Sequence, residues 1–77
     1  MNDEIFEILA ELRPEFDFRD SEDFVMDGLL DSFDIISLVS IIEEKYNIRI
    51  DGMDIVPENF VSADAIINMI NNSGAKS

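Results

Sequence analysis

The 77-residue chain contains no cysteine, no histidine and no tryptophan, and only five of its residues are basic. A chain without cysteine has neither a disulfide framework nor a thiolate metal site. Without histidine, a serine of this chain also lacks the usual side-chain base that takes the proton of a nucleophile. We therefore expect that the chain is not an enzyme, and that a reactive serine in it would be modified by another protein.

Acidic residues, by contrast, are abundant: 18 of them give the chain a formal net charge of −13. A surface of this charge repels nucleic-acid phosphates and anionic lipid heads, and it favours encounters with basic patches on other proteins. The same charge keeps a small protein in solution, and charge alone does not separate these two roles. We expect protein partners and no nucleic acid.

Two further absences concern location and metals. No apolar run approaches the ~18 residues that span a bilayer, and the acidic residues 1–4 lack the basic start of a signal peptide. The spacing of Asp17, Asp20, Asp23 and Asp27 differs from that of a calcium loop, and the required glycine is missing. We expect a cytoplasmic protein with no membrane insertion and no dedicated metal site.

Hydrophobic residues make up 47% of the chain, as in ordinary globular domains, and they recur with the period of helices. The pattern predicts helices over residues 3–12, 32–46 and about 63–71. Pro14 stops the first helix, and Ser62 is a candidate N-cap for the last. The apolar faces of the three helices comprise Ile5, Ile8, Leu9 and Leu12; Ile35, Leu38, Val39, Ile42 and Tyr46; and Ala63, Ile66, Ile67 and Ile70.

The segments between these helices are expected to be irregular. Residues 15–30 form a long loop that must pin its aromatic residues to the core, and residues 47–52 form a connector. One short helical turn is expected within residues 53–60. The prediction is one domain over residues 1–77, all-α, with three main helices and a short third one packed as a four-helix bundle. Residues 71–77 are interpreted as a frayed tail, and we expect a monomer.

The start of the second helix carries the most informative residues. Asp31 is a good N-cap, Asp34 completes a short capping box, and Ser32 is the first residue of the helix. On its own, Ser32 is most simply interpreted as a residue that satisfies free N–H groups at the helix end. A phosphate ester on such a serine would also be favoured, since backbone N–H groups and the helix dipole attract anions there.

A second stripe runs along the same helix, outside its apolar face. It consists of Ser32, Ile36, Ser40 and Glu43, and Phe33, Ser37 and Glu44 lie beside it. Two large apolar residues beside a serine, surrounded by acids, are typical of a docking surface. Phe33 or Ile36 could instead pack under the loop of residues 15–30. The acid pairs Asp31/Asp34 and Glu43/Glu44 are interpreted as caps and solvated residues rather than as acid–base pairs.

The segment Gly28-Leu29-Leu30-Asp31-Ser32-Phe33, followed by a helix with Glu43-Glu44, resembles the acyl carrier protein and peptidyl carrier protein family. The likeness covers nearly the whole chain and implies a fold of the acyl-carrier type. It implies that Ser32 carries a 4′-phosphopantetheine arm, whose thiol holds a cargo as a thioester. It also implies that Asp31 orients the coenzyme A–metal assembly while a phosphopantetheinyl transferase loads the arm.

The resemblance also bears on partners and cargo. Phe33 stands where the family commonly has leucine or methionine, and Ile36 and Ser40 stand where partner enzymes commonly make contact. Ser40 is more polar than the usual residue, and residues 28–33 and 55–60 are similar to D-alanyl carriers and other stand-alone amino-acid carriers. These likenesses imply loading by an adenylating enzyme, and a downstream acyltransferase or synthase with basic docking patches. The alternative is an acidic helical interaction module in which Ser32 merely caps a helix.

Overall fold

The structure, a computed structural model, describes residues 2–73. Over this range it is all helical and contains no strand, so the predicted all-α class is confirmed. Its elements are α1 (Asn2–Leu12), η1 (Phe18–Asp20), α2 (Ser32–Tyr46), η2 (Gly52–Asp54), η3 (Pro57–Phe60) and α3 (Ala63–Asn72), where η marks a short 3₁₀-helix.

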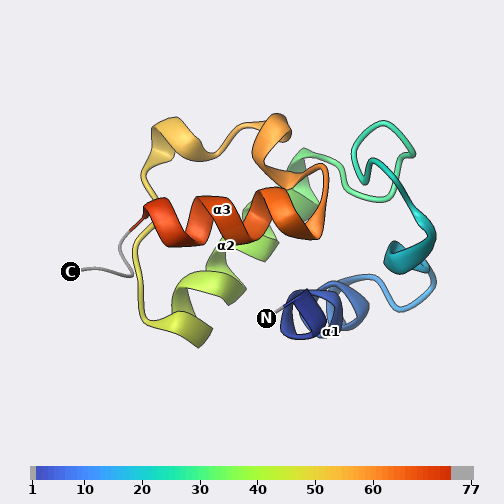
Figure 1. The fold of residues 1–77 in the computed structure, drawn as a ribbon, viewed down its shortest axis with the longest axis horizontal. Helices are drawn as coiled ribbons and strands as arrows, with labels where there is room; N and C mark the ends of the chain where they lie inside the picture. The colour runs from blue at the N-terminus through green and yellow to red at the C-terminus, as the bar shows by residue number, and fades with distance from the viewer. Residues whose placement is uncertain (1, 74–77) are drawn as a thin grey trace.

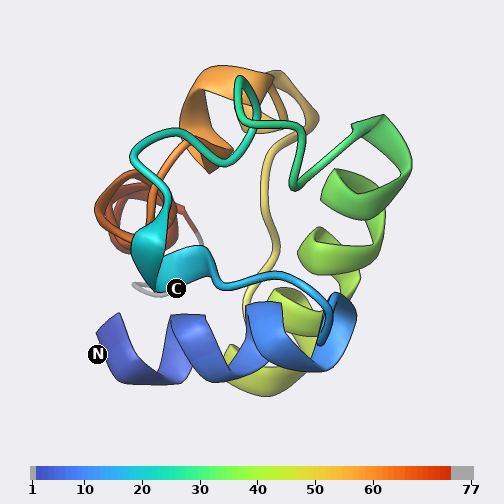
Figure 2. The same cartoon turned by 90° about the vertical axis from the view of Figure 1, so that its right-hand side faces the viewer.

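The three α-helices surround one core (Figures 1 and 2). Helix α1 lies across one end of the molecule and contacts both α2 and α3, while η3 contacts α2 and α3. In Figure 2, α2 lies on one side and α3, seen nearly end-on, lies on the other, and the segment between α1 and α2 crosses over to the side of α3 before returning to α2. This arrangement leaves the start of α2 at the edge of the molecule.

The predicted helix boundaries agree with the structure to within one residue at most ends. The expected single turn within residues 53–60 is instead two 3₁₀-helices, η2 and η3, and the connector of residues 47–51 is irregular. The expected frayed tail was wrong at its start, because Asn71 and Asn72 belong to α3 and the Ser73 hydroxyl donates to the carbonyl oxygen of Met69 at 2.7 Å. Residues 74–77 of that tail lie outside the described residues.

The core draws on the three α-helices, on η1 and η3, and on the segments between them. Most residues of the predicted apolar faces are buried, but Leu12, Tyr46 and Ile67 are only partly buried, and the buried Met69 was missing from the predicted face of α3. The buried hydrophobic residues are Ile5, Ile8, Leu9, Phe18, Phe24, Leu30, Ile35, Leu38, Val39, Ile42, Ile50, Phe60, Ala63, Ile66, Met69 and Ile70.

Phe24 fixes the long segment between α1 and α2. Its ring packs edge-on against Phe18 at 5.2 Å and Phe6 at 6.4 Å between ring centroids. Its backbone N–H donates to the carbonyl oxygen of Val61 at 2.8 Å, and its own carbonyl oxygen accepts from Leu30 at 3.1 Å. The segment is therefore ordered by a central aromatic residue, as its apolar content predicted, and it leads directly into the start of α2.

Truncation of Phe24 tests this account of the core. Phe24→Ala removes a ring that is 1% exposed, and such a change costs about 3–5 kcal/mol of unfolding free energy. A domain of this size has little stability to spare, so we expect Phe24→Ala to be largely unfolded by circular dichroism and urea titration.

Phe33→Ala is the matched control, because the same atoms are removed from a side chain that is 73% exposed. We expect its unfolding free energy to stay within about 0.5 kcal/mol of the wild type. Equal losses in the two variants would contradict the placement of these rings.

Candidate functional site

The candidate site lies at the N-terminus of α2, where Asp31 and Asp34 form the predicted capping box. The backbone N–H of Asp34 donates to Oδ1 of Asp31 at 2.9 Å, and the backbone N–H of Asp31 donates to Oδ2 of Asp34 at 3.2 Å. These two hydrogen bonds satisfy donors that the first turn of a helix leaves free. The prediction of a capping box over these residues is confirmed.

Asp34 differs from the prediction in its surroundings. It was expected among the solvated caps, but it is buried and its side chain is only 6% exposed. Its Oδ1 accepts a hydrogen bond from Nε of Arg13 at 3.0 Å and forms an ion pair with Nη2 of the same guanidinium at 2.9 Å. A buried carboxylate needs such a cation, and Arg13 brings it from just beyond the end of α1.

No pattern in the sequence points to this ion pair. Arg13 lies 21 residues before Asp34 along the chain, so the spacing of residues along one helix does not predict that the two are in contact. A basic residue at the end of one acidic helix is also an ordinary feature, since cations are favoured there. The only available signal was the scarcity of basic residues, which makes each one a candidate partner for an acid that must be buried.

The charges of this site shift two pKa values. The pKa of Asp31 is lowered, mainly by the hydrogen bond from the Asp34 backbone N–H, and the nearby positive charge of Arg13 adds to this effect. The pKa of Arg13 is raised, first by its hydrogen bond to Asp34 and then by the negative charge of that carboxylate. Asp31 therefore remains a carboxylate well into the acid range.

Ser32 is the first residue of α2 and is exposed. The side-chain cap of this helix is supplied by Asp31, and the hydrogen bonds of the capping box run between Asp31 and Asp34 without using the Ser32 hydroxyl. The hydroxyl thus lies at the positive end of the helix dipole and is accessible from outside. This position suits a phosphate ester, which the first backbone N–H groups of the helix stabilise.

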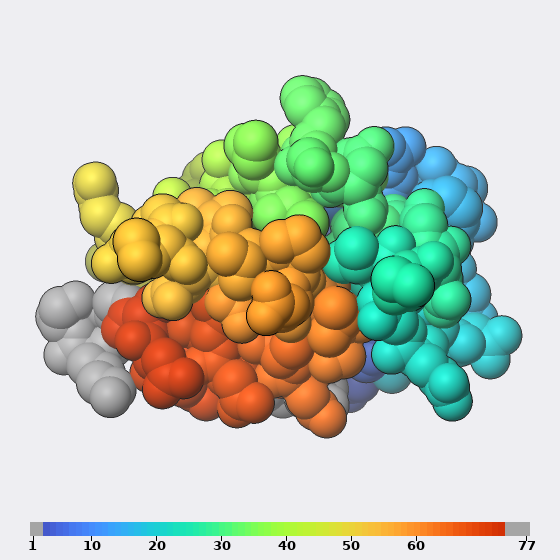
Figure 3. Space-filling model, turned by 90° about the horizontal axis from the view of Figure 1, so that it is seen from above, coloured from blue at the N-terminus to red at the C-terminus, as the bar shows by residue number. Residues whose placement is uncertain are grey.

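A pocket of about 170 Å³ adjoins Ser32. It lies between the first two turns of α2 and the segment that carries η2 and η3, and it is lined by Ser32, Ile35, Ile36, Ile55 and Pro57. Figure 3 shows the two walls side by side, with the start of α2 in green and residues 52–60 in yellow and orange. Apart from the hydroxyl, the named side chains are apolar, so the serine borders an apolar hollow.

The residues of the predicted docking stripe differ in how exposed their side chains are. Phe33 and Ile36 are 73% and 62% exposed, so neither packs under the loop of residues 15–30, and Ser40 is exposed as well. Ile36 forms both part of this stripe and part of the pocket wall. Exposed apolar side chains of this size, one turn apart and next to the exposed Ser32, can form the centre of an interface.

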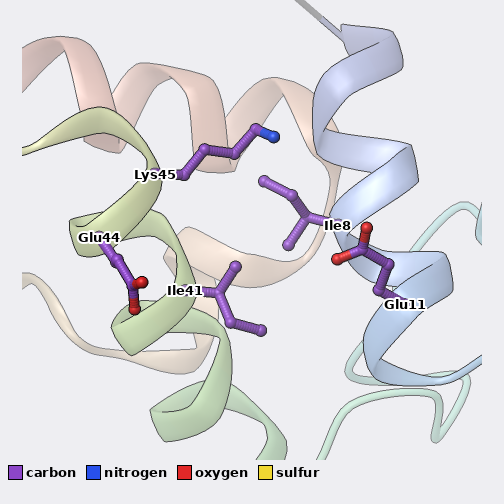
Figure 4. Close-up of a pocket in the computed structure, with 5 residues that line it drawn as sticks. All are labelled: Ile8, Glu11, Ile41, Glu44 and Lys45. Atoms are coloured by element: carbon purple, nitrogen blue, oxygen red, sulfur yellow. The ribbon is translucent and has the colours of Figure 1, made fainter.

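Glu43 and Glu44 have different surroundings. The carboxylate of Glu43 is half-buried and accepts a hydrogen bond from the backbone N–H of Ile50 at 2.9 Å, so it connects α2 to the following segment. Glu44 is exposed and borders a second hollow of about 250 Å³ between α1 and α2. In Figure 4, Ile8 and Ile41 point toward one another there, with Glu11, Glu44 and Lys45 around them.

Two general properties bear on the possible functions. None of the helices within residues 2–73 is long and apolar enough to cross a membrane. Within the same described range, no group of three or more acidic side chains is placed to hold a metal ion.

Comparisons of the chain with known protein families, with characterised proteins and with solved structures gave no match in any of the three. The function is therefore argued from the residues of the site and from their geometry.

The lowered pKa of Asp31 predicts how stability depends on pH. Because this pKa lies below its ordinary value of 3.8 in the folded protein, the ionised cap stabilises the fold above that pH. Its contribution is lost as the pH falls through the folded pKa. We expect the wild type to lose more resistance to urea than Asp31→Asn does between about pH 7 and about pH 3, since asparagine caps helices but does not ionise in this range.

Glu7→Gln removes one negative charge from an exposed position on α1 and serves as the control. Its urea midpoint should follow that of the wild type across the same pH range. The account of the cap is wrong if Asp31→Asn shows the full pH dependence of the wild type.

Proposed function

We propose that this protein is a carrier of acyl or aminoacyl groups, loaded at Ser32 with a 4′-phosphopantetheine arm. The observation that carries the proposal is the position of Ser32: its exposed hydroxyl begins a capped helix and borders an apolar pocket, while the cap itself uses Asp31. The resemblance of residues 28–33 to carrier proteins supports the same conclusion. In this proposal the fold is of the acyl-carrier type, and η3 takes the place of its short third helix.

The residues around Ser32 fit such an arm. The helix N-terminus suits the phosphodiester, and the pocket walls of Ile35, Ile36 and Ile55 suit an uncharged chain next to it. When attached, the arm supplies a thiol that holds the cargo as a thioester. The protein itself contributes the attachment point and the surface that partner enzymes recognise.

Loading needs no catalytic group within the carrier. The Ser32 oxygen bonds to the phosphorus that bears the pantetheine chain of coenzyme A, and the bond from that phosphorus to the adenosine bisphosphate breaks. The hydroxyl proton goes to a base of the phosphopantetheinyl transferase, which explains how a chain without histidine can react at a serine. Asp31, which remains ionised beside Ser32, is suited to orient the coenzyme A–metal assembly during this step.

The resemblance to carrier proteins extends the proposal to the setting of the chain. In this proposal the chain acts in the cytoplasm as a monomer, with a phosphopantetheinyl transferase, an adenylating enzyme and a downstream acyltransferase or synthase as partners. Phe33, Ile36 and Ser40 form the docking surface, and the exposed Glu44 attracts basic patches. Glu43 belongs to this surface only in part, because its carboxylate already bonds Ile50.

Mass spectrometry tests the proposal directly. After incubation with coenzyme A and a broad-specificity phosphopantetheinyl transferase, we expect the wild type to gain the mass of one phosphopantetheine group on the peptide that contains Ser32. Ser32→Ala should gain none, and Ser21→Ala, which alters a serine outside α2 and outside the docking surface, should be loaded like the wild type. A wild type that stays unmodified while a known carrier is loaded would contradict the proposal.

Stability separates this function from the alternative in which Ser32 is a structural cap. We expect Ser32→Ala to stay within about 0.5 kcal/mol of the wild type, as for other surface changes. Ser62 is the matched control, because its hydroxyl does cap α3 and accepts from the Ala65 backbone N–H at 3.1 Å. Ser62→Ala should cost about 1 kcal/mol. A larger loss in Ser32→Ala than in Ser62→Ala would favour the structural role.

Charge reversal tests the docking surface. Glu44→Lys should slow association with the transferase, and the effect should shrink at high salt because added ions screen exposed charges. Glu43 is avoided here, since its loss would also break the hydrogen bond to Ile50. Glu7→Lys makes the same change in net charge on α1, and we expect a smaller effect. Equal association rates for the two variants at low salt would show that α2 does not face the partner.

A further inference from the structure

The ion pair of Arg13 and Asp34 joins the end of α1 to the first turn of α2, in which Ser32 lies. Nε of Arg13 donates to Oδ1 of Asp34 at 3.0 Å, and Nη2 lies 2.9 Å from the same oxygen in an ion pair. The Asp34 side chain is 6% exposed and that of Arg13 is 35% exposed. The guanidinium therefore reaches from the surface to a carboxylate that would be costly to bury alone.

The second oxygen of the same carboxylate leads to the backbone beside Ser32. Oδ2 of Asp34 accepts from the backbone N–H of Asp31, and Oδ1 of Asp31 accepts in return from the backbone N–H of Asp34. One carboxylate thus connects Arg13 to the residue that directly precedes Ser32. If Arg13 were absent, the uncompensated carboxylate would turn toward water, and this movement would weaken the capping box.

We propose that Arg13 is a positioning residue for the modification of Ser32, acting through Asp34 and Asp31. This role rests on the carrier function proposed above. The closed capping box fixes the backbone at Asp31 and so fixes the direction of the Cα–Cβ bond of Ser32, which limits the positions that its hydroxyl can take. Phosphoryl transfer requires the attacking and leaving oxygens to lie in line, so a hydroxyl held to few positions reacts faster than one that samples many.

The positive charge of Arg13 also favours the modification of Ser32. A phosphodiester on Ser32 adds a negative charge next to Asp31 and two residues before Asp34, within the same helical turn. The positive charge of Arg13 acts on both aspartates, through contact with Asp34 and over a longer distance on Asp31. Arg13 therefore offsets part of the repulsion that the first turn of α2 would otherwise present to an anionic group.

A positioning role predicts that a substitution of Arg13 changes the kcat of loading more than its KM. In Arg13→Met we expect the kcat of phosphopantetheine transfer to fall about tenfold, while the KM for the protein changes less than about twofold, because docking residues are untouched. A carboxyl ¹³C titration should show that the pKa of Asp31 moves up toward its ordinary value in this variant, since its hydrogen bond and the nearby positive charge are weakened.

Arg19→Met is the matched control. Arg19 also pairs with an aspartate of another element, since Nη2 donates to Oδ1 of Asp3 at 3.0 Å, and its guanidinium lies over the Phe6 ring at 4.4 Å. The variant loses one positive charge and one ion pair between elements, as Arg13→Met does, but it leaves the capping box intact. We expect kcat and KM close to those of the wild type.

A double variant distinguishes positioning from direct contact with the transferase. In Arg13→Met/Asp34→Asn, the amide oxygen of the new residue accepts from the Asp31 backbone N–H and needs no cation. We expect this variant to recover most of the lost kcat, whereas a residue that touches the transferase would not be rescued. Where Arg13→Met does not fold, Arg13→Lys gives the test, with an intermediate kcat because lysine makes one contact in place of two.

The outcomes separate the two proposals. A wild type that takes up no arm overturns the carrier function, and the role of Arg13 with it. A wild type that is loaded, together with an Arg13→Met variant of unchanged kcat, overturns only the role of Arg13. Equal losses in Arg13→Met and Arg19→Met, or no recovery in the double variant, also contradict it.

Discussion

The capping box at the start of α2, with the Arg13–Asp34 ion pair behind it, is the arrangement on which the rest of the site depends. It sets the residue at which the helix begins, while the spacing of the apolar residues sets which face of α2 is turned toward the core. The buried residues on that face are Ile35, Leu38, Val39 and Ile42, and the exposed Phe33 and Ile36 lie outside it. The same start places the Ser32 hydroxyl at the positive end of the helix dipole, beside an ionised aspartate.

The chain has a net charge of −13, and several of its acidic residues act locally, on backbone N–H groups close to them in the chain. Asp17, Asp31 and Asp51 each cap a helix by accepting a backbone N–H, and Asp23 accepts two N–H groups of the turn that follows it. These carboxylates satisfy donors that short helices and loops leave free. Part of the acidity therefore stabilises a fold rich in helix ends, and the exposed remainder, including Glu44, is available to partners.

The features that local patterns determine were predictable from the sequence. Apolar residues three and four apart, caps at Asp31 and Ser62, and a stop at Pro14 gave the three α-helices and most of the core, because each depends on residues within a turn of one another. The capping box between Asp31 and Asp34 was predictable for the same reason.

The features that depend on tertiary contacts were not predictable. The burial of Asp34 depends on Arg13, which is 21 residues away, and the hydrogen bond from Ile50 to Glu43 depends on how the connector folds back on α2. The pocket beside Ser32 likewise requires Ile55 and Pro57 to lie against the start of α2. The exposure of Phe33 and Ile36 could not be decided either, since it depends on where the segment of residues 15–30 crosses the molecule.

The central claim is that Ser32 is the attachment site of a phosphopantetheine arm. The most direct measurement is the mass of the peptide containing Ser32, taken from the protein as isolated from the cells that make it. The account predicts a phosphopantetheine group on this serine in at least part of the population. An unmodified Ser32 throughout, in cells where another carrier is found loaded, would contradict it.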